Sequence, residues 1–198
     1  MAPSTPSHWG LSGEPSPIHD HGRAAHRQRA ERRPAAEHWL LLSADDIATA
    51  RAEWRNCGVA LLHIGVRVGA VGISGTLVHA AAGTDDPARV SAYLGRALLG
   101  GPVFFHRSIE RYYVLVQGST GRRPELERAG DDAEFTGSAH YLGVPALDVT
   151  TPEAGHTFWS VEFESAGVLA SADVLRQLVD CCRLRVAQTI SAGRRIGD

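Results

Sequence analysis

The chain has 198 residues, of which 43% are hydrophobic and 21% are charged, the composition of an ordinary soluble globular domain with room for a core. All 20 basic residues are arginine, and 22 acidic residues bring the formal net charge to −2. This balance excludes a protein that holds nucleic acid through bulk positive charge, but it allows a local basic patch.

The N-terminal residues have a composition that favours disorder. Pro, Ser, Gly, His and Arg dominate them, and an arginine-rich run extends from Arg23 to Arg33. Such a stretch cannot bury enough apolar surface to offset the entropy lost on ordering. We therefore expect a disordered tail over residues 1–37, a globular domain over residues 38–192 and a flexible C-terminus over residues 193–198.

The first part of the globular domain is predicted to contain a helix and two strands. Ser43 followed by Asp46 is typical of a helix N-terminus, and Gly58 should end this helix just after Cys57. The apolar runs 59–64 and 66–73 then predict two strands that pair beside each other.

The middle of the chain continues with a helix, two strands and a polar segment. Apolar residues at four-residue spacing predict a helix over residues 87–98. Short runs rich in Val, Phe and Tyr predict strands over residues 102–106 and 111–117. The Gly- and Arg-rich residues 118–134 should form a surface excursion between strands.

The last part of the chain is predicted to form two strands and a long helix. The strands should cover residues 139–145 and 157–163, and Ser171 and Asp173 should open the terminal helix. Helices and strands alternate without a strict βαβ repeat. The predicted fold class is therefore α+β, with a mixed central sheet flanked by helices.

The spacing of the cysteines and the hydropathy of the chain indicate the cellular compartment in which the protein is expected. Cys57, Cys181 and Cys182 follow no metal-binding spacing, and the adjacent pair cannot easily close a local bridge, so we expect reduced thiols. No stretch approaches 18 apolar residues, and the N-terminus has no apolar signal core. These observations predict a cytoplasmic protein without a membrane partner.

The order of the predicted elements resembles that of a known family. It is similar to the N-terminal domain of bifunctional DNA primase/polymerases, the prim-pol branch of the archaeo-eukaryotic primase superfamily, over about residues 54–179. The pieces that carry the resemblance are a Trp-helix-Gly start, a Gly-Pro-Val strand, an aromatic strand ending in Leu-Val, a Tyr-x-x-x-Pro strand and a further aromatic strand. They stand here at 54–58, 101–103, 112–116, 141–145 and 158–163.

The resemblance implies a two-metal polymerase site, in which acids on two strands hold Mg²⁺ or Mn²⁺ and a histidine helps to hold the nucleotide. Most of these ligands have no counterpart here. Gly69 stands where an aspartate is expected, Arg111 or Tyr112 stands at the place of the histidine, and only the acid Glu134 can be matched. We therefore expect no metal site, no cofactor and no catalytic residue, with Glu134 as a weak candidate.

Arginine and aromatic residues form the second candidate site. This combination suits the binding of phosphates and the stacking of bases, although Asp131 and Asp132 could neutralise it and leave an ordinary solvated loop. His140 joins the candidates because Ser138-Ala139-His140 resembles the Ser-x-His pattern of the family. The candidate nucleotide- or nucleic-acid-binding residues are Arg107, Arg111, Tyr112, Arg122, Arg123 and His140.

We expect a degenerate prim-pol-like domain that does not polymerise and that binds nucleotide or nucleic acid as an accessory module in DNA replication. Two alternatives stay open. The chain could be an active nucleotidyltransferase that uses Mg²⁺ or Mn²⁺ through displaced acids (Asp85, Asp86, Asp131, Asp132 or Glu134), or a scaffold that binds only other proteins. Activity would need at least two carboxylates within about 4–6 Å of a shared metal position.

Overall fold

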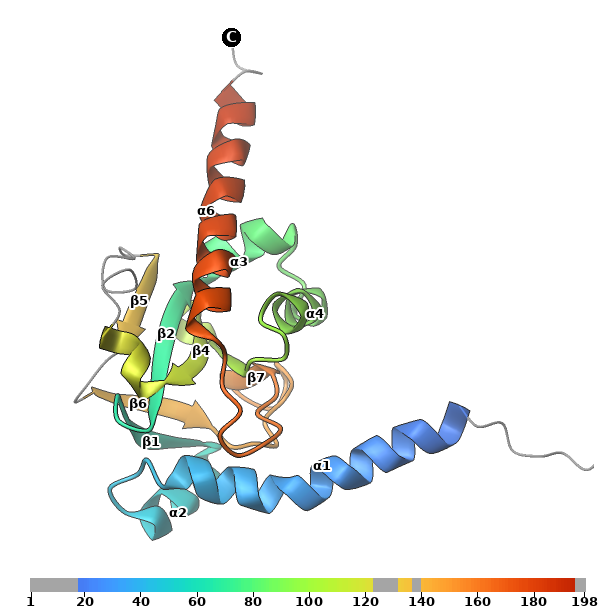
Figure 1. Cartoon of the computed structure of the whole chain (residues 1–198), viewed down its shortest axis with the longest axis vertical. Helices are drawn as coiled ribbons and strands as arrows, with labels where there is room; N and C mark the ends of the chain where they lie inside the picture. Colours follow the sequence, from blue (N-terminus) through green and yellow to red (C-terminus); the bar gives the residue numbers. More distant parts are fainter. Residues whose placement is uncertain (1–17, 123–131, 137–139, 195–198) are drawn as a thin grey trace, which may run out of the picture. The chain divides into compact units, whose positions relative to one another are not determined.

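The computed structural model describes residues 18–122, 132–136 and 140–194 (Figure 1). The chain divides into two compact units, Met1–Glu31 and Arg32–Asp198. The first unit contributes the N-terminal part of helix α1 (Ile18–Leu41), and the second contains every other described element. Helices combined with antiparallel sheets confirm the predicted α+β class.

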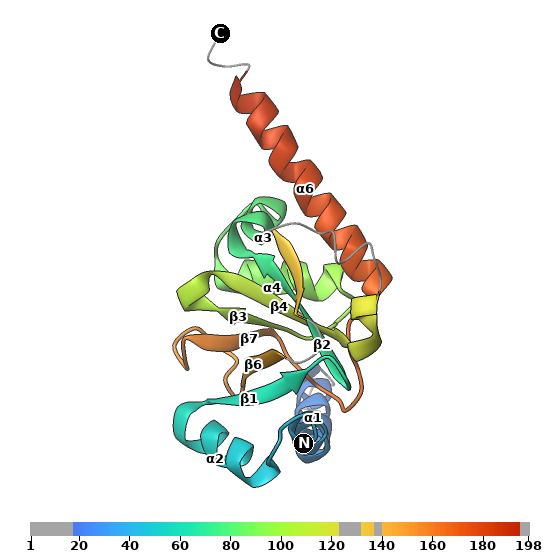
Figure 2. The ribbon, with the colours of Figure 1, turned by 90° about the vertical axis from the view of Figure 1, so that its left-hand side faces the viewer.

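Five strands form the main sheet in the order β5-β2-β4-β3-β7, and each neighbouring pair is antiparallel (Figure 2). These strands are β2 (Val68–Ser74), β3 (Val103–His106), β4 (Arg111–Gln117), β5 (Ala133–Thr136) and β7 (Thr157–Val161). A separate two-stranded antiparallel sheet joins β1 (Val59–Ile64) to β6 (His140–Pro145).

The strand pairing differs from the sequence prediction in two respects. All described ladders are antiparallel, whereas we expected one mixed sheet, and the only parallel contact among the described residues is an isolated bridge between Val116 and Ala170. Strands β1 and β2 belong to different sheets and do not pair. Strand β2 is buried along nearly its whole length and pairs with β4 and β5, whereas β1 exposes Leu61 and pairs with β6.

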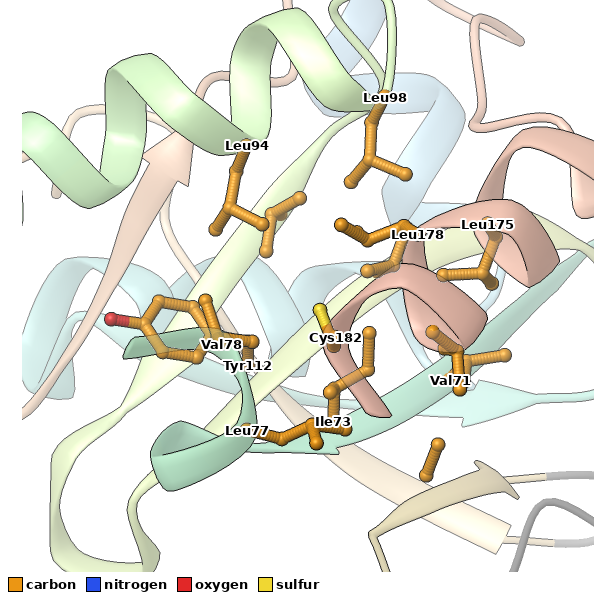
Figure 3. Close-up of a cluster of buried hydrophobic side chains, with 14 of the residues drawn as sticks. Val71, Ile73, Leu77, Val78, Leu94, Leu98, Tyr112, Leu175, Leu178 and Cys182 are labelled. Atoms are coloured by element: carbon orange, nitrogen blue, oxygen red, sulfur yellow. The ribbon is translucent and has the colours of Figure 1, made fainter. Parts of the chain in front are cut away.

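Successive side chains along the strands of the main sheet point alternately into two apolar cores, one on each face of the sheet. On one face, Val71, Ile73 and Tyr112 pack with residues of helices α3 (Gly75–Ala82), α4 (Pro87–Ala97) and α6 (Ala172–Arg194), as Figure 3 shows. On the other face, Phe104 and Leu115 pack with residues of β1, β6 and helix α2 (Ile47–Cys57). We call these faces the α6 face and the β1 face.

The predicted helices are present with one change of cap, and two further helices, α1 and α3, were not predicted. The helix N-cap is Asp46, whose carboxylate accepts the backbone N–H of Thr49 at 2.6 Å, so Ser43 is not the cap. This helix ends at Gly58, which has a φ of 72°. Helix α3, which follows β2 directly, was not predicted.

Helix α1 (Ile18–Leu41) runs through the domain boundary that the sequence predicted at residue 37. Ala36 and Leu40, one helical turn apart, are fully buried in the core of the β1 face. Trp39 stacks on Phe163 with ring centroids 5.7 Å apart. A few apolar residues at helical spacing therefore anchor the C-terminal part of an otherwise polar helix. Residues 1–17 and 195–198 lie outside the described residues.

Candidate functional site

Tyr112, one of the predicted binding residues, faces the α6 face and is only 3% exposed. Its hydroxyl lies 3.0 Å from Nε2 of His79 on helix α3, and its ring lies 4.4 Å from that of Phe105. Burial raises the pKa of Tyr112 to about 12. A ring in this position belongs to the core and cannot stack on a base unless the core opens.

Arg107 and Arg111 lie at the same end of the β3–β4 hairpin. Arg107 begins the one-turn 3₁₀ helix η1 (Arg107–Ile109) that connects the two strands, and its Nη2 donates to the carbonyl oxygen of Pro152 at 3.3 Å. Arg111 is the first residue of β4 and stands directly opposite His106, the last residue of β3. The structure therefore brings two of the predicted residues together.

The other predicted residues lie elsewhere. Arg122 ends the 3₁₀ helix η2 (Gly118–Arg122), which follows the far end of β4, and Arg123 lies outside the described residues. His140 begins β6 in the two-stranded sheet, where it stands opposite Ile64. The five predicted residues that the structure describes therefore do not form one surface around the β3–β4 hairpin.

The strand register determines which side chains lie near Arg111 on the same face of the sheet. Arg111 lies on the β1 face, because it precedes Tyr113 and Leu115 at two-residue spacing along β4. Glu134 of β5 stands opposite Gly72 of β2, and Gly72 in turn stands opposite Tyr113. His106, Arg111 and Glu134 consequently share one end of the β1 face.

Arg111 reaches across β2 to the carboxylate of Glu134, with 3.0 Å between Nη1 and Oε2. Strands β4 and β5 flank β2, so the two side chains together span two strand spacings, about 10 Å. They do so over Gly72, where a Cβ atom would lie 3.5 Å from Cδ of Arg111 and 3.1 Å from the Tyr113 ring. The missing side chain at Gly72 therefore leaves the space in which these groups meet.

Charge and burial make this end of the sheet different from the rest of the β1 face. The Arg111 side chain is 23% exposed and that of Glu134 is 68% exposed, whereas Leu115 further along β4 is fully buried. The pKa of Tyr113 is raised, first by burial and further by the Glu134 carboxylate, while the Arg111 guanidinium opposes the shift. The phenol thus lies within range of both charges.

His106 contributes a polar atom that the surrounding structure does not satisfy. Its Nδ1 is buried and has no hydrogen-bond partner among the described residues. A buried polar group without a partner is unfavourable by about 1–3 kcal/mol. A hydrogen-bonding group bound beside Arg111, such as a phosphate oxygen or a water molecule, is one way to supply that partner.

The position at which the resemblance expects a metal-binding aspartate is tightly packed, so a side chain there would require its neighbours to shift. A Cβ atom at Gly69 would lie 3.0 Å from the carbonyl oxygen of Gln117 and 3.0 Å from the Phe135 ring. Gly69 also points to the α6 face, away from Glu134. Within the described ranges, no three His, Cys, Asp or Glu residues are grouped closely enough to hold a metal ion.

One of the acids that the nucleotidyltransferase alternative invokes has a structural role. The carboxylate of Asp86 accepts the backbone N–H of Arg89 at 2.9 Å and caps helix α4. Asp132 precedes β5, and its carbonyl oxygen accepts the backbone N–H of Ser74 at 2.9 Å. Asp131 lies outside the described residues.

A groove of about 300 Å³ between helix α2 and the β1–β6 sheet was not foreseen from the sequence. Asp45, Asp46, Glu53 and the exposed Leu61 and Tyr141 line it. Glu53 accepts the backbone N–H of Leu61 at 3.1 Å, and the carbonyl oxygen of Ser43 accepts that of His63 at 2.7 Å. These contacts satisfy two donors on the outer edge of β1, which protects that edge from pairing with another chain.

Comparisons of this chain with protein-family models, with curated proteins and with solved structures found no match. Among the helices that the structure describes, none combines the length and the apolar character needed to cross a membrane.

Proposed function

We propose that this chain is a prim-pol-like domain that binds the phosphate groups of a nucleotide or a nucleic-acid strand and does not polymerise nucleotides. The observation that carries the proposal is the pairing of Arg111 with His106, directly opposite each other at a partly exposed end of the main sheet. The proposal includes the cytoplasmic location that the sequence predicts.

The chemistry of the two side chains supports a phosphate ligand. A guanidinium group presents N–H donors in a planar fork that fits two oxygens of a phosphate, and such charge-assisted bonds are stronger than neutral ones. The Nδ1 of His106, on the residue opposite Arg111 in the strand pairing, is buried without a hydrogen-bond partner, so it must become accessible before it can contact the ligand. Arg107, at the adjacent turn, adds a second positive charge at the same end of the hairpin.

The surroundings of Glu134 support binding without polymerisation. A two-metal clamp needs further carboxylates near the first one. Glu134 faces Gly72 across the strand pair, and its carboxylate is engaged by the Arg111 guanidinium at 3.0 Å. A positive charge this close works against a divalent cation at the same oxygen atoms.

The first test is a binding titration with two arginine variants. A fluorescent deoxynucleoside triphosphate and a fluorescent single-stranded oligonucleotide are titrated separately, which shows whether nucleotide or strand is the preferred source of the phosphate. Arg111→Gln should abolish binding. Arg176→Gln, which removes an exposed arginine in an Arg176–Asp180 pair on α6, should leave binding unchanged.

Primer synthesis on a single-stranded template with Mn²⁺ completes the test. No product together with binding supports the proposal. Product above the control without protein would show an active nucleotidyltransferase, and the proposal would be wrong. Absence of both binding and product would leave the protein-binding scaffold as the remaining interpretation.

A further inference from the structure

We propose that Glu134 competes with the phosphate ligand for Arg111, so that the ion pair seen here is an autoinhibitory contact that the ligand must displace. This inference rests on the proposed function, because it concerns the regulation of the same site.

The Glu134 carboxylate occupies an Arg111 donor that a phosphate would also use. Oε2 of Glu134 lies 3.0 Å from Nη1 of Arg111, within normal hydrogen-bond distance. A carboxylate and a phosphate both offer two oxygens to a guanidinium fork, so they compete for the same donors. Glu134 is the more exposed partner, 68% against 23% for Arg111, and its side chain can turn into solvent when a ligand takes its place.

The strand that carries Glu134 does not depend on this ion pair. Strand β5 is bound to β2 through the register from Ala70–Thr136 to Ile73–Ala133. Ala133 is buried in the core of the α6 face, and Phe135 packs against the same core. Because Glu134 points to the opposite, polar side, a conservative change at this position should leave the fold intact.

The expected gain in affinity follows from the ordinary strength of such pairs. A partly exposed ion pair typically contributes about 0.2–1 kcal/mol, so removing the competitor should tighten phosphate binding by about 1.4- to fivefold. Glu134→Gln keeps the size of the side chain and removes its charge, which makes it the appropriate variant.

A nearby acid provides the control for general charge repulsion. Asp132 is exposed and lies two residues before Glu134, and Asp132→Asn removes one negative charge without touching the ion pair. Glu134→Asp keeps the charge but shortens the side chain by one methylene group. Competition predicts tighter binding by Glu134→Gln and Glu134→Asp, and a smaller change in Asp132→Asn.

The experiment titrates the full chain and these variants with the fluorescent deoxynucleoside triphosphate, after thermal unfolding has verified that each variant is folded. If Asp132→Asn tightens binding as much as Glu134→Gln, the effect is general repulsion and the competition is refuted. If Arg111→Gln loses binding while Glu134→Gln is no tighter than wild type, the competition alone is refuted. If neither wild type nor Glu134→Gln binds, the proposed function and this inference both fail.

Discussion

Gly72→Ala adds one methyl group at the point where Arg111 crosses strand β2. The new Cβ atom would lie 3.1 Å from Cε1 of Tyr113 and 3.5 Å from Cδ of Arg111. Tyr113 is only 8% exposed and stacks on Phe104 with ring centroids 5.2 Å apart, so its ring has little freedom to move away. The substitution should therefore overpack the β1 face against the Tyr113 ring, whereas the contact with Arg111 is an ordinary van der Waals contact.

The magnitude follows from two opposing effects. Overpacking a well-packed site destabilises a protein by about 1–3 kcal/mol, whereas replacing glycine with alanine restricts the unfolded chain and stabilises by about 0.4–1 kcal/mol. Together these effects leave a net loss of about 1 kcal/mol in the free energy of unfolding, within limits of about 0 and about 2.6 kcal/mol.

Urea unfolding followed by tryptophan fluorescence measures this loss, with Gly95→Ala as the matched control. Gly95 lies within helix α4, and a Cβ atom there would have no neighbour within 4 Å. The control should gain about 0.5–1 kcal/mol, because glycine is unfavourable inside a helix. An equal rise of the urea midpoint in both variants would refute the reasoning about Gly72.

Two further predictions concern stability. Tyr112→Phe removes the hydroxyl group that contacts His79 and should lower the free energy of unfolding by about 1 kcal/mol, which urea titration measures. The same variant should not change phosphate binding in the titration with the fluorescent nucleotide. Asp46→Ala removes the cap of helix α2 and should lower the urea midpoint at neutral pH. The backbone N–H of Thr49 holds the pKa of Asp46 below its ordinary value of 3.8, so this stabilisation is complete above that value and is lost as the pH falls below it. The difference between wild type and variant should therefore shrink in urea titrations at decreasing pH, and a constant difference would contradict the assignment.

The elements with strong local signals could be predicted from the sequence. Helix α4 has an aspartate cap, a proline at its first position and apolar residues at four-residue spacing. Helix α3 was missed because it has only eight residues and begins at Gly75 directly after β2, without a side-chain cap. Helix α1 was missed because its arginine-rich composition outweighs the few apolar residues that anchor it.

Long-range pairing could not be read from local signals. Strand β1 pairs with β6, about 80 residues later in the chain, and no turn in the sequence indicates this partnership. The candidate site could be predicted from the sequence only in part. Arginine is a residue type that binds phosphate, so Arg111 could be singled out. Its position relative to His106, Gly72 and Glu134 depends on the register of four strands. Tyr112 and Arg111 are neighbours in the sequence and lie on opposite faces, which composition alone cannot show.

The most direct test of the central claim is to follow the imidazole resonances of the protein by NMR during titration with a deoxynucleoside triphosphate. His106 lies beside Arg111, whereas His79 contacts Tyr112 on the opposite face of the sheet and serves as an internal reference. The resonances of both are assigned with His106→Gln and His79→Gln. The account predicts a saturable shift of the His106 resonances, lost in Arg111→Gln, with those of His79 unchanged. Saturable binding that leaves the His106 resonances unmoved would contradict it.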